Sequence, residues 1–341
     1  MSHSLTLWIP NFNRVLQTLI EIGADDDKTS LPALQTLWAR GDLLSAREED
    51  FYSHACYLFH QANTFPVAPL EASLQIDDFD SRAFWVRVDP VQMIPDRDTL
   101  VLIPPQDLNI QEEESKALLA TFNEHFGADG VTLEFGGPSQ WYLRIAQPVD
   151  ISSTSLPSAA YRNLHGLYPQ GNAATYWRQL MNETQMLFFD HPVNQARRDQ
   201  GLAEINSVWV WGEGLLEGDK IKQRPQAAIS ASSSYLQALA LNCQAVWQPQ
   251  AAKLSSCLSF NFNEASSIQH ELAVIDIDDR HFNEDILVEF DRDWFQPALQ
   301  ALKEKKIHSL LIDLGGKNIL HFKPPHLRRF WRRKTVVTRM L

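Results

Sequence analysis

The sequence predicts an α/β protein whose core is a largely parallel β-sheet. In the second half of the chain, short apolar runs typical of strands alternate with helical patterns, and such alternation favours a parallel sheet. The 341 residues are 44% hydrophobic and include 10 Trp and 18 Phe, which supply a bulky core and exclude wholesale disorder. This length suits about two domains, and it suits a single large α/β domain with an insertion equally well.

The first elements of the chain are of mixed type. Residues 5–9 form a short apolar run that stops at Pro10, which predicts a buried strand. Helical spacing of apolar residues follows over 31–40 and 49–60. Ser30 is a suitable N-cap for the first of these helices, and Gly41 is suitable at its end.

The middle of the chain predicts further strands and two long helices. Strands are expected over 84–88 and 100–103, with a loop over 89–98 between them, and a hairpin is expected from 131–135 and 141–145. The helix patterns cover 109–126 and 173–189, and the second must end before Pro192. The later elements are strands over 208–211, 227–230, 272–277 and 307–313, and helices over 235–241 and 294–303.

The charge and cysteine content narrow the class of protein. Thirty Lys and Arg against 42 Asp and Glu give a net charge of −12, which disfavours nonspecific binding to nucleic acid or to an anionic membrane. The three cysteines include no C-x-x-C pair. Neither a signal peptide nor a run of about 18 apolar residues is seen, so a cytoplasmic protein without a membrane span is expected.

One loop gathers polar side chains suited to a ligand. His191, Asn194 and Arg197 precede the strand over 208–211, and α/β proteins often bind ligands beside such strands. Arginine forms a fork that fits carboxylate or phosphate, so a small anionic molecule would suit this set. The alternative is that His191 and Asn194 only brace the turn after the long helix while the arginines are solvated. Common motifs such as G-x-S-x-G, the P-loop and H-E-x-x-H are absent.

Several motifs, taken as a series, resemble a known family. They are L-Y-P-Q-G at 167–171, L-M-N-E at 180–183, H-P-V-N-Q-A-R at 191–197 and I-N-S-V-W-V-W-G-E-G at 205–214. The series is similar to the archaeal-type cofactor-independent phosphoglycerate mutases of the alkaline phosphatase superfamily. More narrowly, W-V-R-V-D-P at 85–90 and W-Y-L-R at 141–144 resemble the bacterial RpfE-type regulatory proteins. The similarity is clearest over about residues 82–245.

This resemblance implies a domain division and a ligand site. It implies an alkaline-phosphatase-like core from residues 1–81 and 196–341, interrupted by an α+β insertion over 82–195. Arg87 and Arg144 lie in strands where the family places arginines for its phosphorylated substrate. The implied site for a small anionic metabolite is Arg87, Arg144, His191, Asn194 and Arg197, with structural ion pairing as the alternative.

The metal ligands of the family are incompletely matched. Its first strand ends in a metal-binding Asp-Gly, whereas the strand over 5–9 runs into Pro10 and Asn11. Asp278, His281, Asp313 and His321 are partial remnants, and the acidic loop around Asp278 has an ordinary solvated loop as its alternative. A two-metal centre needs nearly all of its ligands. We therefore expect a noncatalytic regulatory or ligand-sensing protein, a pseudoenzyme without a cofactor. The alternative is a phosphomutase or phosphatase that uses Mn or Mg.

The C-terminal segment differs in charge from the remainder of the chain. From Lys317 onward there are eight Lys and Arg and no acid, which leaves the remainder with 22 basic against 42 acidic residues. Phe330 and Trp331 lie among the arginines. Such a segment docks either on the protein's own acidic surface or on an acidic partner. Nucleic acid is the less favoured partner, because the remainder of the chain would repel it.

Overall fold

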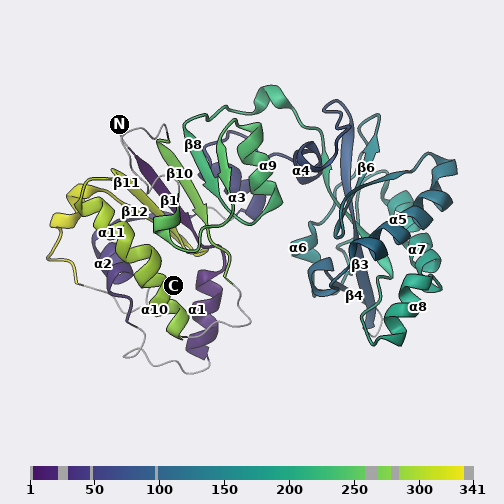
Figure 1. Cartoon of the computed structure of the whole chain (residues 1–341), viewed down its shortest axis with the longest axis horizontal. Helices are drawn as coiled ribbons and strands as arrows, with labels where there is room; N and C mark the ends of the chain where they lie inside the picture. Colours follow the sequence, from purple (N-terminus) through teal and green to yellow (C-terminus); the bar gives the residue numbers. More distant parts are fainter. Residues whose placement is uncertain are drawn as a thin grey trace. The chain divides into compact units, whose positions relative to one another are not determined.

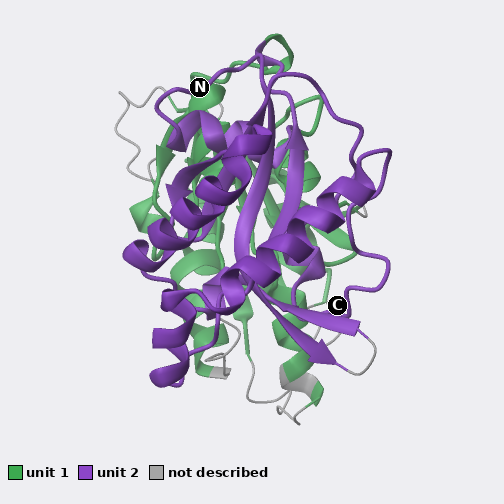
Figure 2. Cartoon of the chain, turned by 90° about the vertical axis from the view of Figure 1, so that its right-hand side faces the viewer, with its two compact units in different colours: residues 1–64, 219–341 green, residues 65–218 purple. Residues whose placement is uncertain are grey.

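The computed structural model describes residues 3–21, 30–46, 49–96, 99–257, 268–277 and 284–333. The chain divides into two compact units (Figure 2): unit 1 comprises residues 1–64 and 219–341, and unit 2 comprises residues 65–218. Within the described residues, none of the helices combines the length and the apolar character that crossing a membrane requires.

Unit 1 contains a seven-stranded sheet in the order β2-β12-β11-β1-β10-β8-β9 (Figure 1). The strands are β1 (Ser4–Trp8), β2 (Asp42–Ser45), β8 (Ala227–Ser230), β9 (Val246–Gln248), β10 (His270–Val274), β11 (Ser309–Asp313) and β12 (Asn318–Phe322). The five strands from β11 to β9 are parallel, whereas β12 and β2 pair antiparallel. Trp8 is in register with Val274 and Asp313, so these residues end their strands at one edge.

The helices of unit 1 pack on both faces of this sheet. They are α1 (Phe12–Glu21), α2 (Pro32–Arg40), α3 (Phe51–Leu58), α9 (Ser234–Asn242), α10 (Glu284–Phe290) and α11 (Gln296–Lys303). Leu7 shares a core cluster with Leu34 of α2 and Leu299 of α11. Successive side chains of a strand point to opposite faces, so Trp8 faces away from this cluster, and there it contacts α3 through Phe51.

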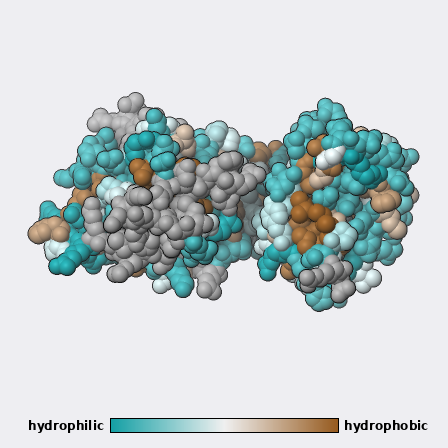
Figure 3. All heavy atoms as spheres, turned by 90° about the horizontal axis from the view of Figure 1, so that it is seen from below, coloured by the Kyte–Doolittle hydropathy of each residue, from teal (hydrophilic) through white to brown (hydrophobic). Residues whose placement is uncertain are grey.

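Unit 2 is built on a five-stranded antiparallel sheet. Its strands are β3 (Phe84–Asp96), β4 (Thr99–Ile103), β5 (Leu133–Gly137), β6 (Gln140–Ile145) and β7 (Ser207–Gly214), and the long β3 pairs with β4, β6 and β7. Its helices are α4 (Val67–Gln75), α5 (Glu112–Phe126), α6 (Leu156–Ala159), α7 (Ala174–Phe189) and α8 (Pro192–Asp199). Hydrophobic atoms gather on the face of unit 2 seen in Figure 3. Exposed apolar side chains of this unit include Ile94, Met186 and Phe189.

The limits of unit 2 differ from the insertion expected over 82–195. Ala68 and Ala72 of α4 share a core cluster with Trp85 and Tyr142, and this burial ties α4 to the sheet of unit 2. At the other limit, β7 pairs along β3 over residues 207–214. The segments 65–81 and 196–218 therefore belong to unit 2, because their apolar faces are buried against β3 and β6.

Candidate functional site

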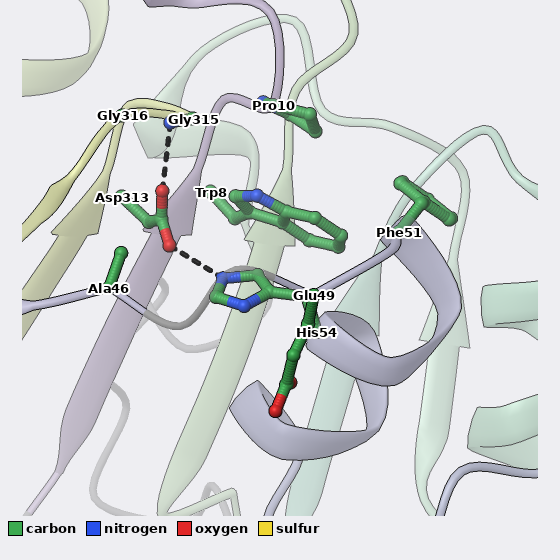
Figure 4. A pocket seen from close by; sticks show the side chains of 9 residues that line it. All are labelled: Trp8, Pro10, Ala46, Glu49, Phe51, His54, Asp313, Gly315 and Gly316. Atoms are coloured by element: carbon green, nitrogen blue, oxygen red, sulfur yellow. Dashed lines mark hydrogen bonds and ion pairs between the residues drawn. The ribbon is translucent and has the colours of Figure 1, made fainter. Parts of the chain in front are cut away.

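A cavity of about 270 Å³ lies at the edge of the sheet of unit 1 where β1 and β11 end (Figure 4). Its lining residues are Trp8, Pro10, Ala46, Glu49, Phe51, His54, Asp313, Gly315 and Gly316. They come from the ends of the parallel strands β1 and β11, from the loops that follow these two strands, from the segment between β2 and α3, and from α3. Open α/β sheets commonly bind ligands at the carboxyl ends of their strands.

Asp313 and His54 form a buried pair in this cavity. The Nε2 atom of His54 lies 2.6 Å from Oδ2 of Asp313, and the two residues are 7% and 2% exposed. The backbone N–H of Gly315 donates to Oδ1 of the same carboxylate at 2.8 Å. Both carboxylate oxygens are therefore bonded to the protein, which offsets the cost of burying the charge.

The start of α3 positions the imidazole. Asp50 caps this helix, since its side chain accepts hydrogen bonds from the backbone N–H groups of Tyr52 and Ser53 at 2.8 and 3.1 Å. A capped first turn orders the next residue of the helix, His54, for its contact with β11.

An aromatic wall adjoins the polar pair. The rings of Trp8 and Phe51 stack with centroids 4.8 Å apart, and the Trp8 ring meets His54 edge-to-face at 5.2 Å. These contacts restrict the rotation of the imidazole ring and place an apolar surface beside the Asp313 carboxylate (Figure 4).

Two glycines allow the loop after β11 to approach the turn after β1. Gly315 has a φ of +72°, and a Cβ there would overlap the carbonyl oxygen of Pro10. A Cβ on Gly316 would overlap the side chain of Asn13, whose backbone N–H donates to the Leu314 carbonyl at 3.0 Å. Only glycine fits both requirements at residue 315, namely a left-handed backbone and close packing.

Two of the residues predicted as remnants of metal ligands, Asp313 and His321, lie in different surroundings. Asp313 lies in the cavity, but the Nε2 atom of His321 lies 3.0 Å from the Ser309 hydroxyl. Asp278 and His281 lie outside the described residues. In the part of the chain that is described, no group of three or more His, Cys, Asp or Glu side chains is arranged to hold a metal ion. A metal site that includes Asp278 and His281 therefore stays a prediction.

Arg87, the first predicted ligand-binding arginine, lies inside unit 2. Its guanidinium donates to Asp89 at 2.9 and 2.7 Å and pairs with Glu71, and all three side chains are buried. It also lies over the rings of Tyr142 and Trp211, 5.5 and 5.0 Å from their centroids. This arginine neutralises two buried carboxylates.

Arg144 has a different environment on the neighbouring strand β6. Its side chain is 41% exposed, pairs with Glu134 at 3.3 Å, and donates to the Asp78 carbonyl at 3.2 Å. These contacts differ from those of Arg87, so the two guanidinium groups share no hydrogen-bond partner among the described residues.

The remaining predicted residues lie on or beside α8. His191 caps this helix, since its Nδ1 atom accepts from the Val193 N–H, and its Nε2 atom lies 3.0 Å from the Thr121 hydroxyl. Partial burial lowers the pKa of His191. Asn194 is buried and bonds to the backbone of Ile205 and Phe188. In this structure both side chains brace the turn after α7.

Arg197 is also held by its neighbours. It is 1% exposed, pairs with Glu114 at 2.7 Å, and donates to the carbonyl of Ala203. An anion at these five residues stays a prediction, and it would have to replace existing bonds at Arg87, Asn194 and Arg197.

The comparison with known proteins gives partial matches. No protein-family model matches the sequence. Over 149 residues the chain is 26% identical to the probable 2,3-bisphosphoglycerate-independent phosphoglycerate mutase of Geobacter sulfurreducens, covering 43% of this chain and 37% of that protein. Over 109 residues it is 26% identical to the 2,3-bisphosphoglycerate-independent phosphoglycerate mutase of Methanosarcina barkeri, covering 31% and 27%. The chain thus matches well under half of the length of these relatives.

Solved structures with a related fold cover most of the chain. The PH0037 protein from Pyrococcus horikoshii has a TM-score of 0.54 at 11% identity, covering 94% of this chain and 87% of that one. The cofactor-independent phosphoglycerate mutase of Thermoplasma acidophilum has a TM-score of 0.49 at 15% identity, covering 95% and 90%. The predicted α/β class with a largely parallel sheet is confirmed, and part of the chain is similar in sequence to cofactor-independent phosphoglycerate mutases.

Proposed function

We propose that this protein is a noncatalytic, ligand-sensing relative of the cofactor-independent phosphoglycerate mutases, of the RpfE regulatory type. It holds its ligand in the cavity between Trp8, His54 and Asp313. The observation that carries the proposal is the Asp313 carboxylate, whose two oxygens bond to His54 and to the Gly315 N–H. These two bonds hold the carboxylate in one orientation at the wall of the cavity.

The bonds of Asp313 also bear on the metal-dependent alternative. A divalent cation would have to displace the imidazole from Oδ2 or compete for the same oxygen, and both partners are buried. At the end of the adjacent strand β1, the residues are Trp8, Ile9, Pro10 and Asn11, so the strand contributes no carboxylate there. The described residues at this edge therefore favour binding over metal-assisted phosphoryl transfer.

The cavity lining indicates the class of ligand. Among the described residues that line it are the acids Glu49 and Asp313 but neither arginine nor lysine, so the charge of these residues disfavours the anionic metabolite expected from the sequence. Trp8 and Phe51 offer an apolar surface beside the polar pair. A volume of about 270 Å³ suits a small molecule. The ligand is a small neutral or cationic compound with hydrogen-bond donors and one apolar face.

A thermal-shift screen of the full chain tests the binding role. Small amines, amino acids and neutral polyols should include compounds that raise the melting temperature, whereas phosphorylated metabolites should not. Phe51→Ala removes part of the apolar wall and should abolish the shift, and Arg144→Ala in unit 2 should leave it unchanged. Stabilisation by phosphorylated compounds alone, unaffected by Phe51→Ala, would place the site elsewhere.

A turnover assay tests the noncatalytic role. With phosphoglycerate and added Mn²⁺ or Mg²⁺, we expect no metal-dependent mutase or phosphatase activity. A metal-dependent rate that disappears in Asp313→Asn but persists in Ser309→Ala would overturn the proposal in favour of an enzyme. The binding screen is independent of this outcome.

A further inference from the structure

The segment after β12 is fastened to the end of α2. The Arg329 guanidinium donates to the Arg40 carbonyl at 3.0 Å and pairs with Asp42, and Arg332 donates to the Gly41 carbonyl at 2.9 Å. In return, Arg40 donates to the carbonyl of Leu327 at 3.1 Å. Cations are favourable at the C-terminus of a helix, where backbone carbonyls carry partial negative charge.

The bonds made by Arg329 and Arg332 hold a pair of aromatic residues at the surface. Phe330 and Trp331 lie between Arg329 and Arg332, and they are 77% and 67% exposed. Their rings meet edge-to-face with centroids 5.5 Å apart. Because both neighbours are fixed, a partner would find the two rings already in place, and burying such rings is a strong source of binding energy.

Positive charge surrounds this pair. Lys323, Arg328 and Arg333 are exposed, and no ion pair engages them within the described residues. Asp42, the acidic residue beside these cations, pairs with Arg329 and lies 3.3 Å from the Nε2 atom of His326. The hydrogen bond from Arg329 lowers the pKa of Asp42. The cations that remain available favour an acidic partner.

At the adjoining edge of the sheet, no further strand pairs with β2 among the described residues. β2 ends the sheet of the described strands, and its Leu43 and Leu44 are 47% and 44% exposed. Alternate residues of an edge strand direct their N–H and C=O groups away from the sheet. A cavity of about 680 Å³ joins this edge to the arginines, and its lining includes Trp38, Leu43, Arg332 and Arg333.

We propose that this surface, defined as β2 with Arg328, Phe330, Trp331 and Arg333, binds an extended acidic peptide segment of a partner protein by strand addition. Main-chain bonds to β2 would supply the pairing, the leucines and aromatic rings would receive apolar side chains, and the arginines would receive carboxylates. The site is separate from the ligand cavity and does not depend on the proposed function.

Two observations favour a peptide over other polyanions. Neither nucleic acid nor lipid can extend a β-sheet, so the open edge and its leucines would stay unused. The chain outside residues 317–341 carries 22 basic and 42 acidic residues, which repels an extended anionic surface. A short acidic segment contacts only the basic end, because charges beyond about 8–10 Å are screened at physiological salt.

The test measures binding of the full chain to a fluorescent peptide of alternating glutamate and leucine. Saturable binding should weaken about tenfold in Phe330→Ala/Trp331→Ala and in Arg328→Ala/Arg333→Ala. The matched control Met186→Ala changes another highly exposed apolar residue, in unit 2, and should bind like the wild type. The peptide methylated on alternate backbone nitrogens should bind much more weakly, since it cannot donate to a strand edge.

Three outcomes would overturn the proposal. One is the absence of saturable peptide binding by protein whose circular dichroism is native. Another is equal binding of the methylated peptide, which would exclude strand addition. The third is tighter binding of single-stranded DNA, or of vesicles containing phosphatidylserine, with the same loss in the arginine variant. That result would assign the surface to a different class of partner.

Discussion

The imidazole Nε2 atom of His54 lies 2.6 Å from Oδ2 of Asp313, although 259 residues separate the two in the sequence. The pair connects α3 to the end of β11 and lines one side of the candidate cavity. Its contribution to folding and its role in the cavity can be tested separately.

Asp313→Ala should lower the free energy of unfolding by about 1.5–3 kcal/mol, because it removes a charged acceptor and leaves a buried imidazole N–H and the Gly315 N–H without their partner. Urea unfolding followed by circular dichroism measures this loss. Ser309→Ala, on the same strand, removes only the bond to His321 and should cost less. Equal losses in the two variants would contradict a special role for the pair.

Arg87 and Arg144 lie on neighbouring strands but should differ sharply in their effect on stability. Arg87→Met leaves Glu71 and Asp89 buried without their cation, which should cost about 3–5 kcal/mol or prevent folding. Arg144→Met removes a half-exposed ion pair and should cost less than about 1 kcal/mol. Thermal and urea unfolding of the two variants provide the comparison. A small effect of Arg87→Met would mean that the buried acids are neutralised in another way.

His270 should make the protein less stable in mild acid. Burial, together with the nearby His60 and Arg224, lowers the pKa of His270 from 6.5 to about 3. Below pH 6.5 the unfolded chain takes up a proton that the folded chain does not bind, so the free energy of unfolding falls as the pH falls. The slope from this residue approaches about 1.4 kcal/mol per pH unit.

Urea unfolding of the wild type and of His270→Asn, from about pH 7 to about pH 5, tests this dependence. The variant should show a shallower decline, because it lacks the titrating group. His60→Asn is a useful second variant, since the pKa of His60 is also lowered by burial. Parallel curves for wild type and His270→Asn would show that folding does not lower the pKa of His270.

Gly315→Ala should destabilise the cavity and the fold together. The added methyl group would overlap the Pro10 carbonyl, and the left-handed backbone at φ +72° costs further energy in a residue with a Cβ. We expect a loss above about 1 kcal/mol and weaker binding of any ligand found in the screen. Gly127→Ala has open space around its Cβ and should be nearly neutral. If Gly315→Ala left the free energy of unfolding unchanged, the loop after β11 would be able to move away from the Pro10 carbonyl.

Short-range sequence patterns predicted several of the strands and helices. The apolar run at 5–9 corresponds to β1, and the helix expected over 173–189 corresponds closely to α7. The predicted loop over 89–98 was wrong, since β3 continues to Asp96. Asp89 and Pro90 have loop character, but Asp89 is buried by bonds to Arg87 and Trp211, and Pro90 pairs in register with Val208. Tertiary pairing overrode the local signal.

Other features depend on contacts between distant parts of the sequence. Ser30 was expected to cap α2. Instead, the Asp291 carboxylate accepts hydrogen bonds from the first backbone N–H groups of α2, including that of Leu34, which is 257 residues away in the sequence. In the candidate site, Asp313 was named with His321 among the partial remnants of metal ligands, whereas the structure pairs Asp313 with His54. No spacing rule identifies His54, because its role follows from the parallel register of β1 and β11 and from the packing of α3.

The interrupted layout of unit 1 has a consequence for synthesis on the ribosome. β1 begins at Ser4 but pairs with His270 and Ser309, so the first strand must wait for most of the chain to be translated. The 154 consecutive residues of unit 2 emerge before those partners, and domains generally fold as units while translation proceeds. During that interval the apolar strand at the N-terminus has no native neighbour. This exposes it to chaperones and to aggregation, and slow translation beyond residue 218 would lengthen the exposure.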